Sequence, residues 1–137
     1  MARTPTTTSI RCSRTSTRSL LLYIATIHLE YALRAFAAGK SVLCEKPAAV
    51  NARTLQRMID AAREARLLFM EAMKPPFYSL YRRLRGHLQR DPIGEIGLVR
   101  ADCSIASAPP DHPSFSLDVG CGALFDIDIY EVFLAVD

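Results

Sequence analysis

The nine residues from Gly39 to Pro47, G-K-S-V-L-C-E-K-P, constrain the fold more than any other part of the chain. A glycine suits the left-handed position just after a helix, and Ser41–Cys44 is an apolar run of strand length. The proline biases the residue before it toward extended backbone angles. The segment therefore predicts a helix end, a short buried strand, and Lys46 held where that strand ends. Open α/β sheets bind their ligands at this place, although a solvated loop without a special role is the simpler alternative.

Helical and strand-like patterns alternate through the first half of the chain. Leu20–Ala25 has the pattern of a buried strand, His28–Ala38 has apolar residues at helical spacing, and Leu67–Met70 is another short apolar run. Asn51 can cap a helix that ends near Ala65. This alternation predicts right-handed βαβ units and a parallel sheet, so the expected class is α/β.

The second half of the chain has a different pattern. A basic amphipathic helix is predicted over Tyr78–Gln89, with its leucines turned inward. Ile96–Ile105 alternates in part, as a strand covered on one side would. Ala123–Val136 has the pattern of a strongly apolar final helix. We expect this strand and this helix to open a second domain.

Four motifs resemble one enzyme family. They are A-G-K-S-V-L-C-E-K-P ending at Pro47, F-M-E-A-M at Phe69–Met73, I-G-E-I-G at Ile93–Gly97 and G-A-L-F-D-I-D-I-Y at Gly122–Tyr130. Together they are similar to the glucose–fructose oxidoreductase / inositol dehydrogenase / MocA (Gfo/Idh/MocA) family, and most of all to its trans-1,2-dihydrobenzene-1,2-diol dehydrogenase-like branch. The resemblance runs from Leu21 to the C-terminus. It implies hydride transfer between NAD or NADP and a sugar, polyol or cyclic diol.

The resemblance also implies a domain organisation. Residues 20–92 would form a partial Rossmann-like parallel sheet, the C-terminal half of the dinucleotide-binding domain. Residues 93–137 would supply the opening strand and helix of an α+β second domain. We interpret residues 1–19 as a disordered or aberrant leader, from a truncated or frame-shifted reading frame. A signal or transit peptide is the alternative, because basic residues precede S-L-L-L-Y-I-A-T-I.

The catalytic candidates follow from the same resemblance. Tyr130 matches the family's acid–base residue, and Asp126 would orient substrate hydroxyls. A phenol can accept a hydroxyl proton only if a nearby cation stabilises the phenolate, and Lys46 would supply that charge. Asp126 and Tyr130 are spaced to share one helix face. The alternative is a core aromatic beside a partly buried acid.

Cofactor contacts are expected from Thr26, His28, Glu45, Lys46 and Pro47, with Glu45 helping to hold the nicotinamide end. The turn that contains the first two reads A-T-I-H, which is shorter than the family's A-T-P…H pattern. His28 therefore fits a surface residue at a helix N-terminus equally well. The resemblance favours a cis Lys46–Pro47 bond, although only about 5–6% of such bonds are cis in folded proteins.

The glycines depart from the pattern of a dinucleotide site. The chain has 6 glycines, and only Gly120-Cys121-Gly122 gives G-x-G, with Phe125 at the next required position of G-x-G-x-x-G. Cys121 replaces a family glycine, as does Asp128, and we expect strain where the backbone must approach closely. We also expect this chain alone to bind NAD or NADP weakly and not to catalyse hydride transfer. A non-catalytic truncated product or interaction module is thus the alternative function.

Charge and composition exclude several classes of protein. The net charge of +3 is too small to indicate a nucleic-acid partner, and no apolar run has the length of a membrane span. The 4 cysteines lack metal-ligand spacing, and His112 has no second ligand near it, so we expect no metal. We expect a cytoplasmic protein with free thiols. Its full-length form should bind a carbohydrate or diol and form a homo-oligomer. In this chain alone we expect exposed apolar faces at Val99–Ile105 and Ala123–Val136, which favour aggregation or oligomers.

Overall fold

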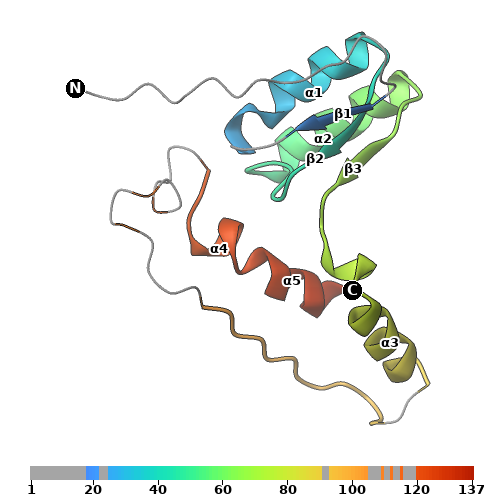
Figure 1. The fold of residues 1–137 in the computed structure, drawn as a ribbon, viewed down its shortest axis with the longest axis vertical. Helices are drawn as coiled ribbons and strands as arrows, with labels where there is room; N and C mark the ends of the chain where they lie inside the picture. The colour runs from blue at the N-terminus through green and yellow to red at the C-terminus, as the bar shows by residue number, and fades with distance from the viewer. Residues whose placement is uncertain are drawn as a thin grey trace.

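The computed structural model describes residues 18–21, 25–90, 93–104, 109, 112, 115 and 120–137. Its elements in chain order are β1 (Arg18–Leu21), η1 (Ala25–Ile27), α1 (His28–Ala37), β2 (Ser41–Cys44), α2 (Ala52–Glu64), β3 (Phe69–Glu71), η2 (Pro75–Phe77), α3 (Ser79–Leu88), α4 (Ala123–Asp126) and α5 (Ile129–Val136) (Figure 1). The predicted strand Ser41–Cys44 is confirmed residue for residue, and the three helices predicted before residue 90 are confirmed within one or two residues.

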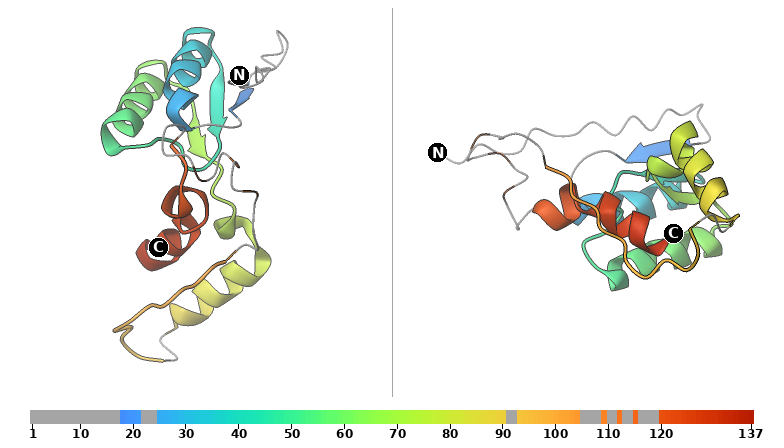
Figure 2. Two further views of the ribbon diagram at one scale, coloured as in Figure 1. Left: turned by 90° about the vertical axis from the view of Figure 1, so that its left-hand side faces the viewer. Right: turned by 90° about the horizontal axis from the view of Figure 1, so that it is seen from below.

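The three strands form one parallel sheet in the order β1-β2-β3. Leu43 of β2 lies beside Leu20 of β1 on one side and Met70 of β3 on the other. Both crossovers step in the same direction, so right-handed connections place α1 and α2 on the same face of the sheet, as the left view of Figure 2 shows. The predicted α/β class and parallel βαβ units are therefore confirmed.

The core lies between this sheet face and the two helices. Val42 and Cys44 point toward the helices and are 1% and 0% exposed, whereas Leu43 between them points away and is 39% exposed. This is the two-residue period of a strand. The helices contribute the rest of the core: Ala32, Ala35 and Phe36 from α1, and Met58 and Ala62 from α2. Parallel sheets are normally covered on both faces, and here one face of β2 is half open.

Local signals account for the ends of α1 and α2. Gly39 has φ +70°, and its N–H donates to Phe36 O while the next N–H, of Lys40, donates to Ala35 O. These are the two bonds of a Schellman motif. At the start of α2, Asn51 Oδ1 accepts a hydrogen bond from Thr54 N at 2.9 Å. The predicted glycine stop and asparagine cap are both confirmed.

Several predicted elements differ from the structure. The first strand starts two residues before the predicted Leu20, within the segment interpreted as a leader, and residues 1–17 and 22–24 lie outside the described part. The third strand begins at Phe69 rather than Leu67. The predicted strand over Ile96–Ile105 is wrong for residues 96–104, which are irregular. An alternating sequence forms a strand only with a neighbour to satisfy its backbone groups.

The later helices also depart from prediction. The helix predicted over Ala123–Val136 divides into α4 and α5 at residues 127–128. Two leucines of α3 are not turned inward, because Leu80 is 76% exposed and Leu84 is 50% exposed, whereas Leu88 is half-buried. Besides η2, α3 contacts α5, where the rings of Tyr81 and Phe133 lie 5.7 Å apart.

The chain leaves the sheet after β3 and later returns to it. Figure 1 shows it passing through η2 to α3, then running back along residues 93–104 toward α4 and α5. The α3–α5 contact is completed by Asp137, whose carboxylate accepts a hydrogen bond from Tyr81 Oη at 2.5 Å and pairs with Arg85 at 3.2 Å. Among the described residues, no helix is long and apolar enough to cross a membrane.

Candidate functional site

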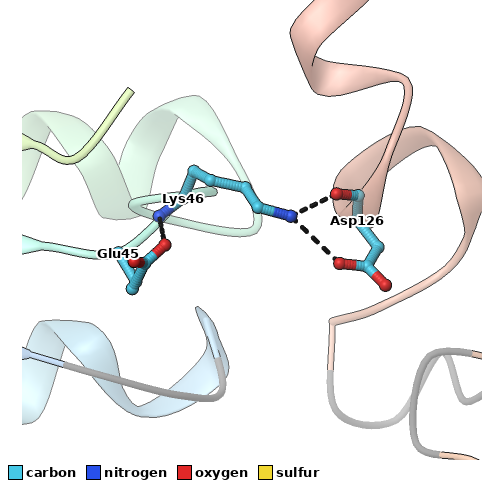
Figure 3. Close-up of polar contacts among 3 residues, drawn as sticks. All are labelled: Glu45, Lys46 and Asp126. Atoms are coloured by element: carbon cyan, nitrogen blue, oxygen red, sulfur yellow. Dashed lines mark hydrogen bonds and ion pairs between the residues drawn. The ribbon is translucent and has the colours of Figure 1, made fainter. Parts of the chain in front are cut away.

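The site begins at the carboxyl end of β2, where the chain turns sharply. Glu45 Oε2 accepts a hydrogen bond from the backbone N–H of Lys46 at 3.0 Å. The Lys46–Pro47 bond is cis, as the resemblance favoured. From this corner the Lys46 side chain extends toward α4, as Figure 3 shows. The predicted position of the lysine at a strand exit is confirmed.

Lys46 is joined to Asp126, 80 residues away in the sequence. Its ammonium donates to the backbone carbonyl of Asp126 and forms an ion pair with Oδ1 at 3.0 Å (Figure 3). The side chain of the lysine is 13% exposed and that of the aspartate is 35% exposed. A charge-assisted bond that is partly shielded from water is stronger than a surface pair. The two contacts link α4 to the loop that follows β2.

Tyr130 also lies near the same ammonium. Lys46 Nζ is 5.2 Å from the centroid of the Tyr130 ring, which is a cation–π distance. The expected proximity of the two residues is present, and the ring is half-buried rather than enclosed in the core. We had expected Lys46 to lie beside Tyr130. In the structure its ammonium lies beside Tyr130 and also forms an ion pair with Asp126.

Two glycines shape the segment that leads into α4. Gly120 has φ +71° and Gly122 has φ +118°. A Cβ at Gly120 would lie 3.3 Å from Thr26 Cγ2 and would clash with Val50. The loops after β1 and β2 therefore touch this segment directly. Thr26, which was expected to contact cofactor, is exposed at this junction.

The strain expected at the two replaced family glycines is not found. Asp128 has φ −69°, and Arg66 is the one non-glycine residue with positive φ in the described ranges. Cys121 therefore does not have a positive φ; its two glycine neighbours, Gly120 and Gly122, do. Both retained glycines stand where glycine is required, and the replacements stand where a side chain is tolerated.

Two cysteines near the site are poorly suited to ionise. Burial raises the pKa of Cys44 to about 12, with Glu71 and Glu45 adding to the effect. Burial also raises the pKa of Cys121; Asp126 raises it further and Lys46 opposes the shift. Both thiols are free, as is the exposed thiol of Cys103. Within the described ranges, no group of three His, Cys, Asp or Glu side chains could hold a metal ion.

His28 is buried, so its interpretation as a surface residue is wrong. It is 1% exposed, and its Nδ1 lies 3.1 Å from Ala48 O. Burial lowers its pKa, while the carbonyls of Ala48 and Pro47 and the carboxylates of Glu45 and Glu71 raise it more weakly. A neutral ring with its proton on Nδ1 satisfies this bond and leaves Nε2 buried without a partner.

Glu71 belongs to the same region, although its sequence context predicted no role for it. Its Oε1 accepts a hydrogen bond from Ala48 N at 2.7 Å. The usable signal was its position at the end of β3, because the carboxyl ends of neighbouring parallel strands meet at one edge. His28 and Glu71 therefore both contact Ala48, behind the corner that carries Lys46.

The fold and the site together define a Rossmann-type α/β domain with charged residues at its strand ends. Comparison with known families agrees: the profile of an oxidoreductase family with an NAD-binding Rossmann fold matches residues 9–73. The chain belongs to the Gfo/Idh/MocA oxidoreductase family, as the resemblance indicated. The match begins at residue 9, inside the segment 1–19 that was interpreted as a leader.

Individual relatives agree with this assignment. The trans-1,2-dihydrobenzene-1,2-diol dehydrogenase of Danio rerio is 37% identical over 80% of this chain and 34% of its own length. The scyllo-inositol 2-dehydrogenase (NADP(+)) of Bacillus subtilis is 34% identical over 84% of this chain and 38% of its own. A mutant 3-ketoreductase from Actinomadura kijaniata, crystallised with TDP-benzene and NADP, is 31% identical with a TM-score of 0.82, over 90% of this chain and 38% of its own. The chain thus spans about a third of the length of the relatives it matches.

The residues fit a nicotinamide dinucleotide only in part. Glu45, Lys46 and Pro47 line the end of β2, where the family fold places its cofactor. Pyrophosphate, however, is bound by backbone N–H groups of a glycine loop at a helix N-terminus, and the sequence has no G-x-G-x-x-G. In the described structure, Ile27 precedes α1 and provides no side-chain cap. The residues expected at the nicotinamide end are therefore at a strand end, and the glycine fingerprint expected for pyrophosphate is not in the sequence.

Proposed function

We propose that these residues are part of an NAD(P)-dependent oxidoreductase that transfers hydride between the nicotinamide cofactor and a sugar, polyol or cyclic diol. The observation that carries the proposal is the meeting of Lys46, Asp126 and Tyr130 at the carboxyl end of β2. The relatives support the substrate class, because their names specify a cyclic diol and an inositol. The structural relative was crystallised with NADP.

The chain's own residues would handle the proton of the reaction. Oxidising a secondary alcohol removes a hydride from carbon and a proton from oxygen. The Tyr130 phenolate, stabilised by the ammonium beside its ring, would take the proton and become the phenol, while the hydride would pass to the oxidised nicotinamide. The Asp126 carboxylate would accept a hydrogen bond from a neighbouring substrate hydroxyl while it keeps the Lys46 ammonium in place.

We further propose that these 137 residues alone bind the cofactor weakly and do not turn over. Pyrophosphate carries the fixed negative charge of the cofactor, and no glycine loop is present to bind it. A non-catalytic product or interaction module remains the second candidate. It is favoured by exposed apolar residues such as Leu80 and Leu98, which are 76% and 85% exposed. A cytoplasmic location and a homo-oligomeric full-length form stay predictions.

The first experiment compares two proteins. One is the chain itself, and the other is a hybrid in which it replaces the matching third of the Danio rerio relative. Both are titrated with NADH and NADPH while nicotinamide fluorescence is followed, and both are assayed with a trans-dihydrodiol and with inositol. We expect saturable binding and turnover in the hybrid, with turnover lost in Tyr130→Phe.

Two results would contradict the proposal. Micromolar saturable binding by the chain alone would show that the missing cradle is not needed. A folded hybrid that binds cofactor but oxidises neither substrate would favour the non-catalytic alternative.

A further inference from the structure

The backbone of Ala48 is held by side chains from three different elements. His28 Nδ1, from α1, lies 3.1 Å from its carbonyl oxygen. Cys44 Sγ, from β2, donates to the same oxygen at 3.8 Å. Glu71 Oε1, at the end of β3, accepts from its N–H at 2.7 Å. We call this set of contacts the Ala48 clamp.

The clamp matters because Ala48 is buried in a loop. It is 2% exposed, so its N–H and carbonyl need partners within the protein. Most loops obtain those partners from water at the surface. Here they come from side chains, and the bond to Glu71 involves a carboxylate, which makes it a strong one. The conformation of the loop therefore depends on Glu71 and His28.

Lys46 is two residues before Ala48, on the far side of Pro47. We propose that Glu71 and His28 are positioning residues, whose bonds to Ala48 fix this loop and thereby direct the Lys46 ammonium toward Asp126 and Tyr130. A catalytic use of this lysine position rests on the proposed function. The positioning of Lys46 does not depend on that function, so it can be tested without measuring turnover.

The lysines of the chain provide a direct readout. The sequence has three of them, Lys40, Lys46 and Lys74. The side chain of Lys46 is 13% exposed and ion-paired, whereas Lys74 is exposed. Limiting acetic anhydride applied to the full chain, followed by mass spectrometry of the peptides, gives a labelling rate for each lysine. In the wild-type chain we expect the slowest rate at Lys46.

Matched pairs of variants test the clamp. Glu71→Ala removes the acceptor for Ala48 N, whereas Glu71→Gln keeps an oxygen there without the charge. We expect Glu71→Ala to raise the rate at Lys46 about tenfold relative to Lys74, a change in population that loss of one charge-assisted hydrogen bond allows. Glu71→Gln should stay near wild type. His28→Leu should behave like the alanine variant, and His28→Asn, which keeps a donor, like the glutamine variant.

A control separates positioning from general loosening. Met58 is 0% exposed in α2, and Met58→Ala weakens the core that Ala48 shares without removing any hydrogen bond of the clamp. It should leave the relative rate at Lys46 unchanged. The proposal is overturned if Glu71→Ala leaves Lys46 as slow as in wild type, or if Met58→Ala speeds it equally. If Glu71→Ala does not fold, the His28 pair decides by the same criterion.

Discussion

At the scale of single residues, His28 links the stability of the fold to pH. Its pKa is lowered from 6.5, chiefly by burial. The unfolded chain therefore takes up a proton near pH 6.5, while the folded chain does so only at lower pH. The stability that depends on neutral His28 is complete above pH 6.5 and declines as the pH falls toward the folded pKa. Glu45 and Glu71 reduce this effect, because both favour the charged ring.

We predict that the free energy of unfolding falls between pH 7.5 and pH 5.5, the interval around the ordinary histidine pKa. His28→Leu should flatten this dependence, because leucine takes up no proton. Urea unfolding at a series of pH values measures it, with His87→Leu on exposed α3 as the matched control. Equal slopes for the wild type and His28→Leu would show that another group is responsible.

At the scale of elements, α2 ends in the same backbone conformation as α1, but with arginine rather than glycine at the positive-φ position. Arg66 has φ +53°; its N–H donates to Arg63 O, and the N–H of Leu67 donates to Ala62 O. These are again the bonds of a Schellman motif, with arginine at the position that glycine prefers. A non-glycine residue there costs about 1–2 kcal/mol, part of which glycine's greater freedom in the unfolded chain offsets.

We predict that Arg66→Gly raises the free energy of unfolding by about 0.5 kcal/mol, the difference between those two effects. Gly39→Ala should lower it by about 0.5 kcal/mol for the same two reasons, with no added clash, because a Cβ there would meet nothing within 4 Å. Denaturant unfolding of both variants checks the pair. A stabilising Gly39→Ala would contradict the assignment of the two helix ends.

The same comparison shows which elements the sequence could predict. Gly39, Asn51 and the run Ser41–Cys44 act on their own neighbours, so α1, α2 and β2 follow from local rules. Residues 96–104 alternate as a strand does, but a strand needs a partner that no local pattern supplies.

Some features of the site likewise follow from local sequence, and others do not. The position of Lys46 is local, because a strand end and a proline determine it. Its ion pair with Asp126 joins distant parts of the chain and was not predicted. The family resemblance had paired Lys46 with Tyr130. Glu71 was missed because its partner is a backbone N–H, which has no signature in the side-chain sequence.

At the scale of the whole molecule, much apolar surface is uncovered. Exposed leucines and valines lie on α3, on residues 93–104 and on α5, among them Leu80, Leu98 and Val136 at 76%, 85% and 78% exposure. Where exposed apolar side chains are contiguous, they favour contact with other protein. We therefore predict that the purified chain self-associates.

Sedimentation velocity over a range of concentrations tests this prediction. The weight-average mass should rise with concentration, and it should rise less in the double variant Leu80→Lys, Leu98→Lys. The matched double variant Thr54→Lys, Gln56→Lys on α2 should behave like the wild type. A monomer at every concentration would contradict the prediction and would show that these side chains are stable in water.

The central claim is that the ammonium of Lys46 acts in the chemistry at the end of β2. The most direct measurement is kcat of the hybrid enzyme carrying Lys46→Ala, with Lys74→Ala, at an exposed lysine, as the control. We predict that Lys46→Ala lowers kcat by about 10²–10⁴-fold, the range for a positioned acid–base group, while Lys74→Ala leaves it unchanged. An unchanged kcat in Lys46→Ala, with the chemical step rate-limiting, would show that Lys46 only fastens α4 to the sheet.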